Sequence, residues 1–442
     1  MGVHIPVEFL VRLLDLLLFT ALACVSTCIV MIGWLLGAIL RGKRDIQHRR
    51  ALFMVPTVLE DLKNKGVTWM IETRDENGYF EHVYSVHPFT PLSRVVEIND
   101  KHTVIEFGGR FRTLYAAGLK FSFYLFTVMD FLYNTNRLIK REHISLIRAQ
   151  DPYVIGLLGI LSSALTRVPC CISIHADYDK RYELDGSKGA PVYFGSREVA
   201  KRLERFVLSH AKMVMPIRES LGKSAVANGA KPETIRVIPH GVDLSPFLQE
   251  PNPDFKRDWG LEGKRLVVFV GRLSKENYVY DILEIAKVIY QRYSDVVFAM
   301  LGDGNEAESL KRKIEKDGLS ECMQLLGFQP QEVVVDFRQN ADVNICLMAG
   351  FSLIEAASSG RPIVSYDVEW HYELVRNGDT GFLVPEGDID AASEAIIKLL
   401  DNPELAGRLG ENARKLAIAH HSLEITSWIR VKWYEELMQS GG

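Results

Sequence analysis

The sequence predicts an α/β protein with two parallel-sheet domains that follow one apolar N-terminal helix. Strand-like apolar runs alternate with helix-period segments over residues 50–247, and a second such series covers residues 263–418. A polar segment with two prolines near its start, residues 248–262, separates the two series as a predicted linker. A third observation sets the N-terminus apart, since residues 16–40 contain no charged side chain.

Composition excludes several classes of protein. The formal net charge is -4 over 442 residues, without the basic excess typical of nucleic-acid binders. The cysteines show neither zinc-ligand nor disulfide-framework spacing, which predicts reduced thiols and no metal site. The six cysteines are Cys24, Cys28, Cys170, Cys171, Cys322 and Cys346.

The N-terminal part, residues 1–45, predicts a membrane anchor. As a helix, residues 16–40 would be about 37 Å long, enough for a bilayer core of roughly 30 Å. Trp34 lies near one end, where an indole favours the membrane interface. Basic residues follow the apolar run but do not precede it in excess, so the chain after residue 41 is predicted to be cytoplasmic. The alternative is a helix buried in a protein core.

The first domain is predicted from apolar runs bounded by glycine, proline and polar turns. Its predicted strands are residues 67–73, 82–86, 95–98, 103–107, 144–149, 169–174, 211–215 and 235–239. Its predicted helices are residues 119–140, 152–166 and 195–209.

The second domain repeats the pattern. Its predicted strands are residues 266–270, 295–301, 323–326, 343–347, 363–365 and 382–384. Its predicted helices are residues 279–292, 306–317, 333–339 and 389–400, followed by a helical tail from residue 403. We expect the last stretch, residues 419–442, to pack back on the first domain.

The stretch 346–360 is the strongest candidate for a binding site. It joins the predicted strand 343–347 to a glycine turn at Gly350 and then to a helix with Ser352 as its expected N-cap. Glu355 follows at capping-box spacing, and Gly360 ends the helix. A strand, a glycine turn and a helix N-terminus together can bind an anion such as a diphosphate. The alternative is an ordinary turn in which Glu355 only caps the helix.

Two more strands of the second domain end in glycine turns, at Gly271 and Gly302. In a parallel sheet these turns share one edge, where ligands bind. Arg272 and Lys275 follow the first turn and could neutralise a leaving diphosphate. Each glycine alone could serve backbone geometry only.

In the first domain, His175 follows the predicted strand 169–174 and could orient a sugar or assist proton movement, although a structural histidine is the commoner case. Asp177 and Asp179 form a D-x-D triplet, which we discount as a metal site because no other acidic cluster supports it. Glu373 follows the predicted strand 363–365 and could face the same cleft or be a solvated loop charge.

Taken together, these motifs resemble the retaining family 4 glycosyltransferases (glycosyl transferases group 1), which have the GT-B fold of two Rossmann-like domains facing across a cleft. The similarity covers roughly residues 140–435. It is carried by Ser-Ile-His at 173–175, Ile-Pro-His-Gly-Val-Asp at 238–243, Val-Gly-Arg-Leu at 270–273, Leu-Gly-Asp-Gly at 301–304, Leu-Gly-Phe at 326–328, Gly-Phe-Ser-Leu-Ile-Glu-Ala at 350–356, Gly-Arg-Pro-Ile-Val at 360–364 and Asp-Thr-Gly-Phe-Leu-Val-Pro at 379–385.

The resemblance implies roles for single residues. Arg272 would bind the donor diphosphate, Glu355 the nucleotide ribose, and His175 would face the donor sugar; these three are the predicted catalytic residues. The implied donor site comprises Gly271, Arg272, Lys275, Gly302, Gly350, Phe351, Ser352, Leu353, Glu355 and Glu373. The implied donor is a UDP- or GDP-sugar, with no metal or other cofactor, and the membrane anchor suggests a lipid-linked or glycan acceptor.

Two positions depart from the family pattern. Asn277 stands where the family usually has a lysine, and Leu347 where it usually has a first glutamate. Two alternatives to an active transferase therefore stay open. One is a degenerate GT-B subunit that scaffolds or regulates another transferase, and the other is a sugar-nucleotide epimerase.

Overall fold

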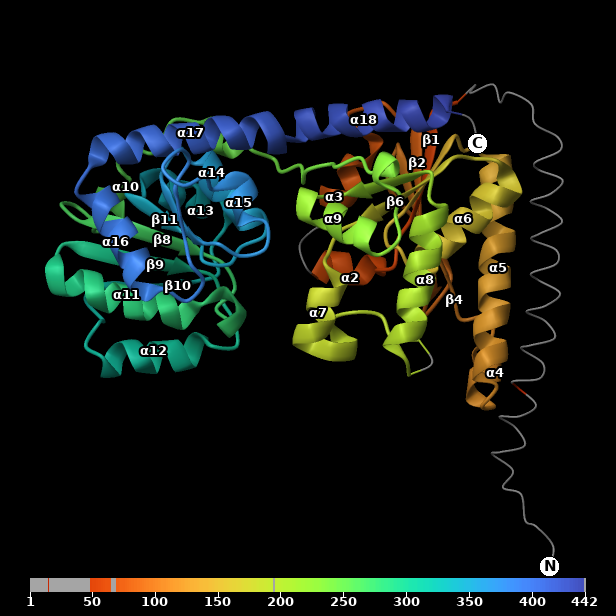
Figure 1. Ribbon diagram of the computed structural model, residues 1–442, viewed down its shortest axis with the longest axis horizontal. Coiled ribbons are helices and arrows are strands. Elements are labelled where there is room, and N and C mark those ends of the chain that lie inside the picture. Colours follow the sequence, from red (N-terminus) through yellow and green to blue (C-terminus); the bar gives the residue numbers. More distant parts are fainter. Residues whose placement is uncertain (1–14, 16–47, 65–68, 194, 441–442) are drawn as a thin grey trace, which may run out of the picture. The chain divides into compact units, whose positions relative to one another are not determined.

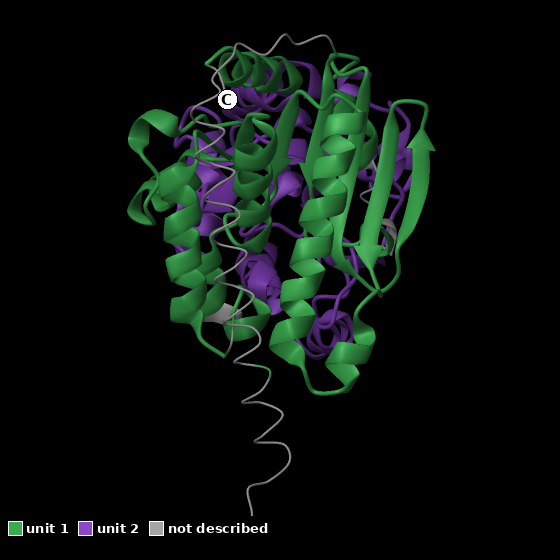
Figure 2. Ribbon diagram, turned by 90° about the vertical axis from the view of Figure 1, so that its right-hand side faces the viewer, with its two compact units in different colours: residues 1–238, 427–442 green, residues 239–426 purple. Residues whose placement is uncertain are grey.

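The computed structural model describes residue 15 and residues 48–64, 69–193 and 195–440. The chain divides into two compact units (Figure 2). Unit 1 comprises residues 1–238 and 427–442, and unit 2 comprises residues 239–426. The expected membrane span, residues 16–40, lies outside the described residues. Among the helices that are described, none is both long and apolar enough to cross a bilayer.

Unit 1 is built on a seven-stranded sheet in the order β3-β4-β2-β1-β5-β6-β7. Figure 1 labels β1, β2, β4 and β6 of this sheet. All neighbouring strands pair in parallel except β3, which is antiparallel to β4. The strands are β1 (Arg50–Met54), β2 (His82–Thr90), β3 (Arg94–Asn99), β4 (His102–Gly108), β5 (Leu146–Ala149), β6 (Cys170–Ile174) and β7 (Met213–Pro216).

Helices cover both faces of this sheet, as the alternation of side chains along β1 shows. Leu52 and Met54 pack in a core with residues of α5, α6 and α8, whereas Ala51 and Phe53 pack with Tyr434 of α18. The helices of unit 1 are α2 (Leu59–Asn64), α3 (Trp69–Glu72), α4 (Arg112–Ala116), α5 (Lys120–Arg141), α6 (Val154–Thr166), α7 (Tyr178–Asp185), α8 (Arg197–His210) and α9 (Glu219–Ala227), with 3-10 turns η1 (Thr73–Asp75), η2 (Gly186–Lys188) and η3 (Pro232–Thr234). α18 (Leu423–Gln439) begins in unit 2 and belongs to unit 1 from Ser427 onward.

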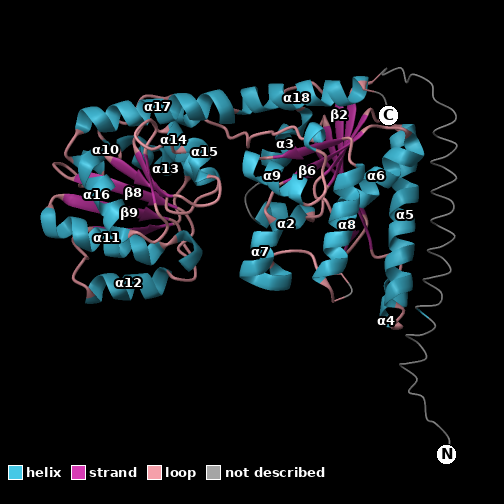
Figure 3. Cartoon of the chain, in the orientation of Figure 1, coloured by secondary structure: helices cyan, strands magenta, loops and turns pink. Residues whose placement is uncertain are grey.

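Unit 2 has a six-stranded parallel sheet in the order β10-β9-β8-β11-β12-β13. Its strands are magenta in Figure 3, where β8 and β9 are labelled. Its strands are β8 (Arg265–Val270), β9 (Val296–Leu301), β10 (Met323–Gly327), β11 (Val343–Ile345), β12 (Ile363–Tyr366) and β13 (Phe382–Val384). Alternate residues of β8 again face opposite cores. Val267 and Phe269 pack with α11 and α16, and Leu266 and Val268 pack with α10 and α13.

The helices of unit 2 are α10 (Phe255–Asp258), α11 (Val279–Arg292), α12 (Ala307–Lys316), α13 (Gln331–Asn340), α14 (Phe351–Ser358), α15 (His371–Leu374), α16 (Ile389–Leu400) and α17 (Pro403–His421), with η4 (Ser245–Leu248) and η5 (Lys275–Asn277). Each unit is therefore an α/β layer structure with a parallel sheet, as the sequence predicts.

Three predicted features of unit 1 and its boundary differ from the structure. Residues 67–73, expected as a strand, contain α3, because β2 already pairs with β1 and β4 and leaves no ladder position beside it. The predicted strand 235–239 is reduced to a single bridge between Val214 and Ile235. The division between units falls at residues 238 and 239, earlier than the expected linker 248–262, since Phe255 and Leu261 are buried in a core of unit 2.

A buried polar cluster in unit 1 predicts that acid lowers the stability of this unit. His102 donates from Nδ1 to the Ile71 carbonyl at 2.9 Å, and its Nε2 lies 2.7 Å from Ser85 Oγ. Ser85 Oγ also accepts from Arg74 at 2.6 Å, so its own proton is directed to an unprotonated His102 Nε2. Burial, and then the charge of Arg74, lower the pKa of His102 to about 3 and that of His87 to about 4.

Both histidines stay neutral in the folded chain while the unfolded chain takes up protons below about pH 6.5. The two neutral histidines therefore contribute their full stabilisation above pH 6.5, and the free energy of unfolding of unit 1 falls as the pH drops toward 4. We expect a loss on the order of 2 kcal/mol per histidine between pH 6.5 and pH 5. Urea unfolding at both pH values measures it, and His102→Gln should reduce the pH dependence. Equal pH dependence in the wild type and His102→Gln would contradict this assignment.

Candidate functional site

The residues singled out in the second domain gather at one edge of the unit 2 sheet. β9, β8, β11 and β12 are consecutive neighbours, and they pair in parallel. Their carboxyl ends therefore lie side by side. The loops that leave β9, β8 and β11 carry Gly302, Gly271 and Gly350, and Glu373 lies on α15, the helix after β12. Unit 2 thus assembles all the predicted donor residues along four adjacent strand ends.

The loops after β8 and β9 pack so closely that only glycine fits. A Cβ built on Gly302 would lie 1.9 Å from the Gly271 carbonyl oxygen, and the φ angle of Gly302 is +136°. A Cβ on Gly304 would lie 2.2 Å from the Leu273 carbonyl oxygen. The Leu273 N–H donates to the Asp303 carbonyl at 3.0 Å, which joins the two loops directly.

Two alanine substitutions should therefore behave differently. Gly302→Ala forces backbone apart and is expected to lower the free energy of unfolding of unit 2 by at least about 2 kcal/mol. Gly350→Ala should leave stability nearly unchanged, because nothing lies within 4 Å of its added Cβ. Urea unfolding of both variants tests the difference, and comparable destabilisation by the two would contradict it.

The loop after β8 presents two exposed cations. Arg272 and Lys275 are both exposed, and the Asn277 side chain donates to the Arg272 carbonyl at 2.8 Å. Asn277, at the position where the family usually has a lysine, therefore shapes this loop. A hydrogen bond from Ser274, with the charges of Arg272 and Lys275, lowers the pKa of Glu276. The loop thus combines positive charge with one ionised carboxylate.

The start of α14 differs from the expected capping box. The helix begins at Phe351 with Gly350 in the N-cap position, so Ser352 lies inside the first turn. Ser352 Oγ donates to the Val270 carbonyl at 2.5 Å, and the same Ser352 Oγ accepts from the Arg338 guanidinium at 2.5 Å. The predicted N-cap role of Ser352 and the capping role of Glu355 are therefore wrong, because tertiary partners occupy both side chains.

Arg338 contacts both Ser352 and Glu355, and no sequence pattern distinguishes it. Its side chain, on α13, is fully buried, and it also donates to Asn344 Oδ1 at 3.3 Å. Its Nε lies 3.9 Å from Glu355 Oε2, while Gln331 donates to Glu355 Oε1 at 3.4 Å. Arg338 thus places a positive charge directly behind the first turn of α14. Asn344 was the available signal, since a polar residue inside an apolar strand needs a partner.

His371 holds the loop that precedes α14. It is buried, with Nδ1 at 2.6 Å from Ser365 Oγ and Nε2 at 3.1 Å from the Ala349 nitrogen. His371 Nε2 also lies 3.1 Å from the Ala349 carbonyl oxygen, so each ring nitrogen of His371 has a partner. Both contacts fix the backbone between β11 and Gly350. His371 cannot be recognised from the sequence, because neither a motif nor its spacing distinguishes it.

Comparison with known families covers both units. Residues 76–246 match the model of glycosyltransferase family 4, and residues 252–416 match that of glycosyl transferases group 1. Each unit therefore contains a domain that matches a glycosyltransferase family. The α/β class with two sheet-containing domains, predicted from sequence, is confirmed by the structure.

The two relatives described next are each less than 30% identical to this chain. An alpha-D-kanosaminyltransferase from Streptomyces kanamyceticus is 29% identical over 233 residues, which cover 51% of this chain and 60% of the relative. An Escherichia coli UDP-Gal:alpha-D-GlcNAc-diphosphoundecaprenol alpha-1,3-galactosyltransferase is 27% identical, covering 63% of this chain and 72% of that protein. The matched part thus spans less than two thirds of the first of these relatives.

Solved structures agree in fold. Sucrose-phosphate synthase from Thermosynechococcus elongatus superposes with a TM-score of 0.68 at 18% identity, covering 89% of this chain and 100% of that one. The Anabaena protein HepE, solved in complex with UDP, gives a TM-score of 0.64 at 16% identity, covering 88% of this chain and 100% of that one.

The remaining predicted site residues differ in their surroundings. His175 is half-buried at the carboxyl end of β6 in unit 1, whereas the other predicted residues belong to unit 2. The side chain of Leu353 is fully buried and its N–H donates to the Gly350 carbonyl at 3.2 Å, so its side chain is not available to a donor. Phe351 is half-buried with its ring 4.5 Å from that of His240, and Glu373 is half-buried on α15.

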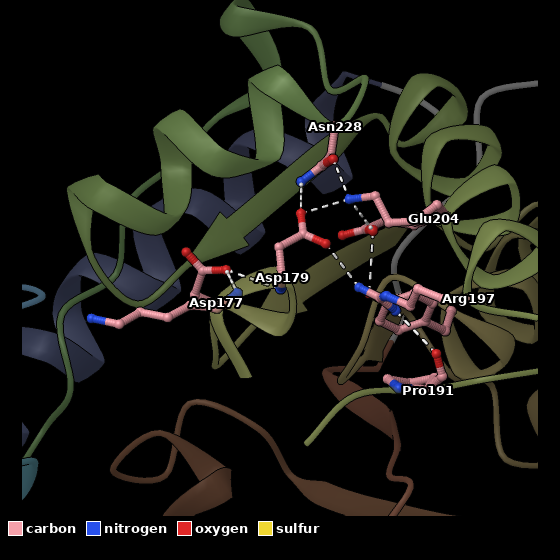
Figure 4. Close-up of polar contacts among 9 residues, drawn as sticks. Asp177, Asp179, Pro191, Arg197, Glu204 and Asn228 are labelled. Carbon is pink, nitrogen blue, oxygen red and sulfur yellow. Dashed lines mark hydrogen bonds and ion pairs between the residues drawn. The ribbon is translucent and has the colours of Figure 1, made fainter. Parts of the chain in front are cut away.

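Both aspartates of the D-x-D triplet have structural partners (Figure 4). Asp177 caps α7, accepting from the backbone nitrogens of Asp179 and Lys180 at 3.0 Å each. Asp179 pairs with Arg197 at 2.9 Å and Lys201 at 2.6 Å. Although burial alone would raise it, the pKa of Asp179 is lowered by these partners. Among the described residues, no group of three or more acidic, histidine or cysteine side chains could hold a metal ion.

Proposed function

We propose that this glycosyltransferase moves a sugar from a nucleoside-diphosphate donor to an acceptor hydroxyl with retention of configuration at the transferred carbon. The observation that carries the proposal is the edge of the unit 2 sheet where four adjacent strands end. This edge presents the exposed cations Arg272 and Lys275 and the closely packed pair Gly271 and Gly302. Positive charge and close backbone approach are what a diphosphate requires.

The residues of unit 2 have separate roles in the proposed reaction. The sugar's bond to the diphosphate breaks, a bond to the acceptor oxygen forms, and the acceptor's proton passes to the departing phosphate. Arg272, with Lys275 beside it, stabilises the charge that develops on that phosphate. The backbone from Gly350 to Ser352 holds the donor, and Glu355 accepts from the nucleotide ribose. His175 of unit 1 faces the donor sugar.

UDP is the favoured donor nucleotide, and the acceptor is a lipid-linked or glycan hydroxyl at the cytoplasmic face of a membrane. The first assignment is supported by the similar Anabaena protein, which was solved with UDP. The second is supported by the E. coli relative, whose name specifies a diphosphoundecaprenol-linked acceptor. The apolar residues 16–40 tether the enzyme near such acceptors, which raises their effective concentration.

Thermal stabilisation by nucleotides tests the donor assignment. UDP at a hundred times its dissociation constant should add about 2.7 kcal/mol to the free energy of unfolding. GDP at the same concentration should add less, and Arg272→Ala should weaken the effect of UDP. Arg292→Ala is a matched control, because Arg292 is an exposed arginine of α11 that pairs with Asp401 at 3.3 Å. Stabilisation by neither nucleotide would contradict the proposal.

A second candidate function is a subunit that supports another transferase without catalysing transfer. Two observations favour it. Leu347, at the position where the family usually has its first glutamate, is fully buried in the core of unit 2, and the Asn277 amide is bonded to the Arg272 carbonyl. Product analysis with a labelled UDP-sugar and a polyprenyl-diphosphate sugar decides between the two. Transfer with retained configuration, read by NMR of the new linkage, supports the enzyme, and nucleotide binding without transfer supports the subunit.

A further inference from the structure

One part of unit 1 carries many large apolar side chains, and none of them is buried. Residues 109–121 run from the loop after β4 through α4 into the start of α5 (Figure 1), and each of them is exposed or half-buried. The large apolar residues among them are Phe111, Leu114, Tyr115, Leu119 and Phe121. Tyr115 is 46% exposed, as is Tyr124 farther along α5. We call residues 109–124 the aromatic hairpin.

The aromatic hairpin has a defined shape although it has no buried core of its own. The rings of Phe111 and Phe126 lie 5.7 Å apart between centroids, and those of Tyr115 and Phe123 lie 5.4 Å apart. These pairs run in opposite order along the two helices, so α4 packs antiparallel to the start of α5. The turn between them is made at Gly118, whose φ is +82°. Apolar side chains held in place on the surface of a folded unit indicate a partner surface.

The loop after β2 adds a further exposed apolar side chain beside the hairpin. A Cβ built on Gly109 would lie 3.2 Å from the Pro91 carbonyl oxygen and 3.9 Å from Leu92 Cα, so the two loops lie against each other. Ser93 Oγ also donates to the Gly108 carbonyl at 2.7 Å. Leu92 is 68% exposed. The exposed apolar surface therefore continues from the aromatic hairpin to Leu92.

The same surface is positively charged. Arg110, Arg112 and Lys120 are exposed, and residues 107–129 contain no aspartate or glutamate. Two nearby carboxylates have partners of their own. Asp130 pairs with Arg110 at 2.6 Å, and Asp15, only 2% exposed, accepts from backbone nitrogens at the start of α5. No carboxylate in the described part of the chain pairs with Arg112 or Lys120, so both cations can meet an external anion.

This combination of rings and cations fits one kind of partner. Aromatic rings favour the headgroup region of a bilayer, and the stems of lysine and arginine lie along apolar surface while their charges reach lipid phosphates. We propose that the aromatic hairpin docks on an anionic membrane surface, with Tyr115 and Leu92 toward lipid and with Arg112 and Lys120 at the level of the phosphates. Two hairpins would repel each other by their charge, which disfavours a second copy of this chain as the occupant.

Docking goes beyond the proposed function because it concerns unit 1 alone, whereas the donor residues belong to unit 2. It gives the folded part of unit 1 its own contact with a membrane. Docking can be measured without a donor or an acceptor. A failure of docking and a failure of sugar transfer are therefore separate results.

Fluorescence from one labelled position tests docking in the full chain. Tyr115→Cys carries an environment-sensitive label in a Cys24→Ser, Cys28→Ser background, where the other four cysteines are buried. Vesicles of phosphatidylcholine and phosphatidylglycerol should shift its emission to the blue and allow quenching by spin-labelled lipid. Phosphatidylcholine alone should have a much smaller effect. Phe206→Cys is the control position, because Phe206 is 47% exposed on α8, which leads to the amino end of β7.

The label at Phe206→Cys should report water with both kinds of vesicle. Equal spectral changes at the two positions, or equal changes with neutral and anionic vesicles, would overturn the proposal. A blue shift of the Tyr115→Cys label that appears without vesicles and grows with protein concentration would overturn it too, since a second copy would then cover the hairpin.

Charge variants test the role of the two cations. Arg112→Gln and Lys120→Gln should each lower the ratio of docked to undocked protein by about fivefold, the usual contribution of one basic residue at an anionic surface. Arg202→Gln and Lys140→Gln are the matched controls, since both residues are exposed elsewhere in unit 1. They should leave the ratio unchanged. Equal losses in the hairpin variants and in the controls would refute docking through this surface.

Discussion

Arg272→Ala is expected to lower the rate of sugar transfer by about a hundredfold to a thousandfold, the usual effect of removing one charge-stabilising group from a transition state. Arg272 is exposed at the carboxyl end of β8, in the loop held by the Asn277 bond to its carbonyl. Its side chain carries no described ion pair, so the fold does not depend on it. A loss of rate without a loss of stability therefore assigns the residue to the reaction.

Steady-state kinetics with a UDP-sugar and a polyprenyl-diphosphate acceptor measure this effect. Arg272→Lys keeps the charge but loses the two-pronged geometry, and it should retain part of the rate. Arg292→Ala should match the wild type. Wild-type turnover in Arg272→Ala, with the urea midpoint unchanged, would refute the role of Arg272 and the donor site built around it.

The second large effect is expected at Arg338. Arg338→Leu should lower the free energy of unfolding of unit 2 by about 3 kcal/mol, the scale for breaking a buried charged network by removing one partner. The substitution removes donors from Ser352 and Asn344 and leaves Glu355 without its nearest positive charge. Because Ser352 and Glu355 lie on the first turns of α14, UDP affinity should fall as well.

Urea unfolding and UDP titration separate these two consequences of Arg338→Leu. Arg312→Leu is the control for loss of an arginine, since Arg312 is exposed on α12. Arg338→Lys keeps the charge and should recover part of the UDP affinity. An Arg338→Leu protein with wild-type stability and UDP affinity would show that the buried guanidinium is dispensable.

Most elements were predictable because their pattern is local. Parallel strands such as β8 and β9 are continuous apolar runs ended by glycine, and both were predicted within one or two residues. β1 was missed although it lies inside the sheet between β2 and β5. Its five residues follow a basic stretch directly, and so short a run has no period that distinguishes a strand.

The candidate site shows the same division. Gly271, Arg272, Gly302 and Gly350 could be placed at strand ends from the sequence, because turns and cations that follow apolar runs are visible in a linear pattern. Arg338 and His371 could not be recognised, because in sequence each looks like an ordinary residue of a helix. Their importance comes from burial and from partners such as Ser352 and Ala349, which lie 14 and 22 positions away.

By itself the sequence determined two α/β units, their strand ends and the positive loop after β8. These follow from hydrophobic periodicity and turn chemistry, which act over a few residues. Only the tertiary structure decided that Ser352 and Glu355 face Arg338 instead of capping α14, and that Asp15 binds the first turn of α5. The physical reason is that buried polar groups take whichever partner the packed chain brings within hydrogen-bond reach, and sequence spacing does not state which partner that is.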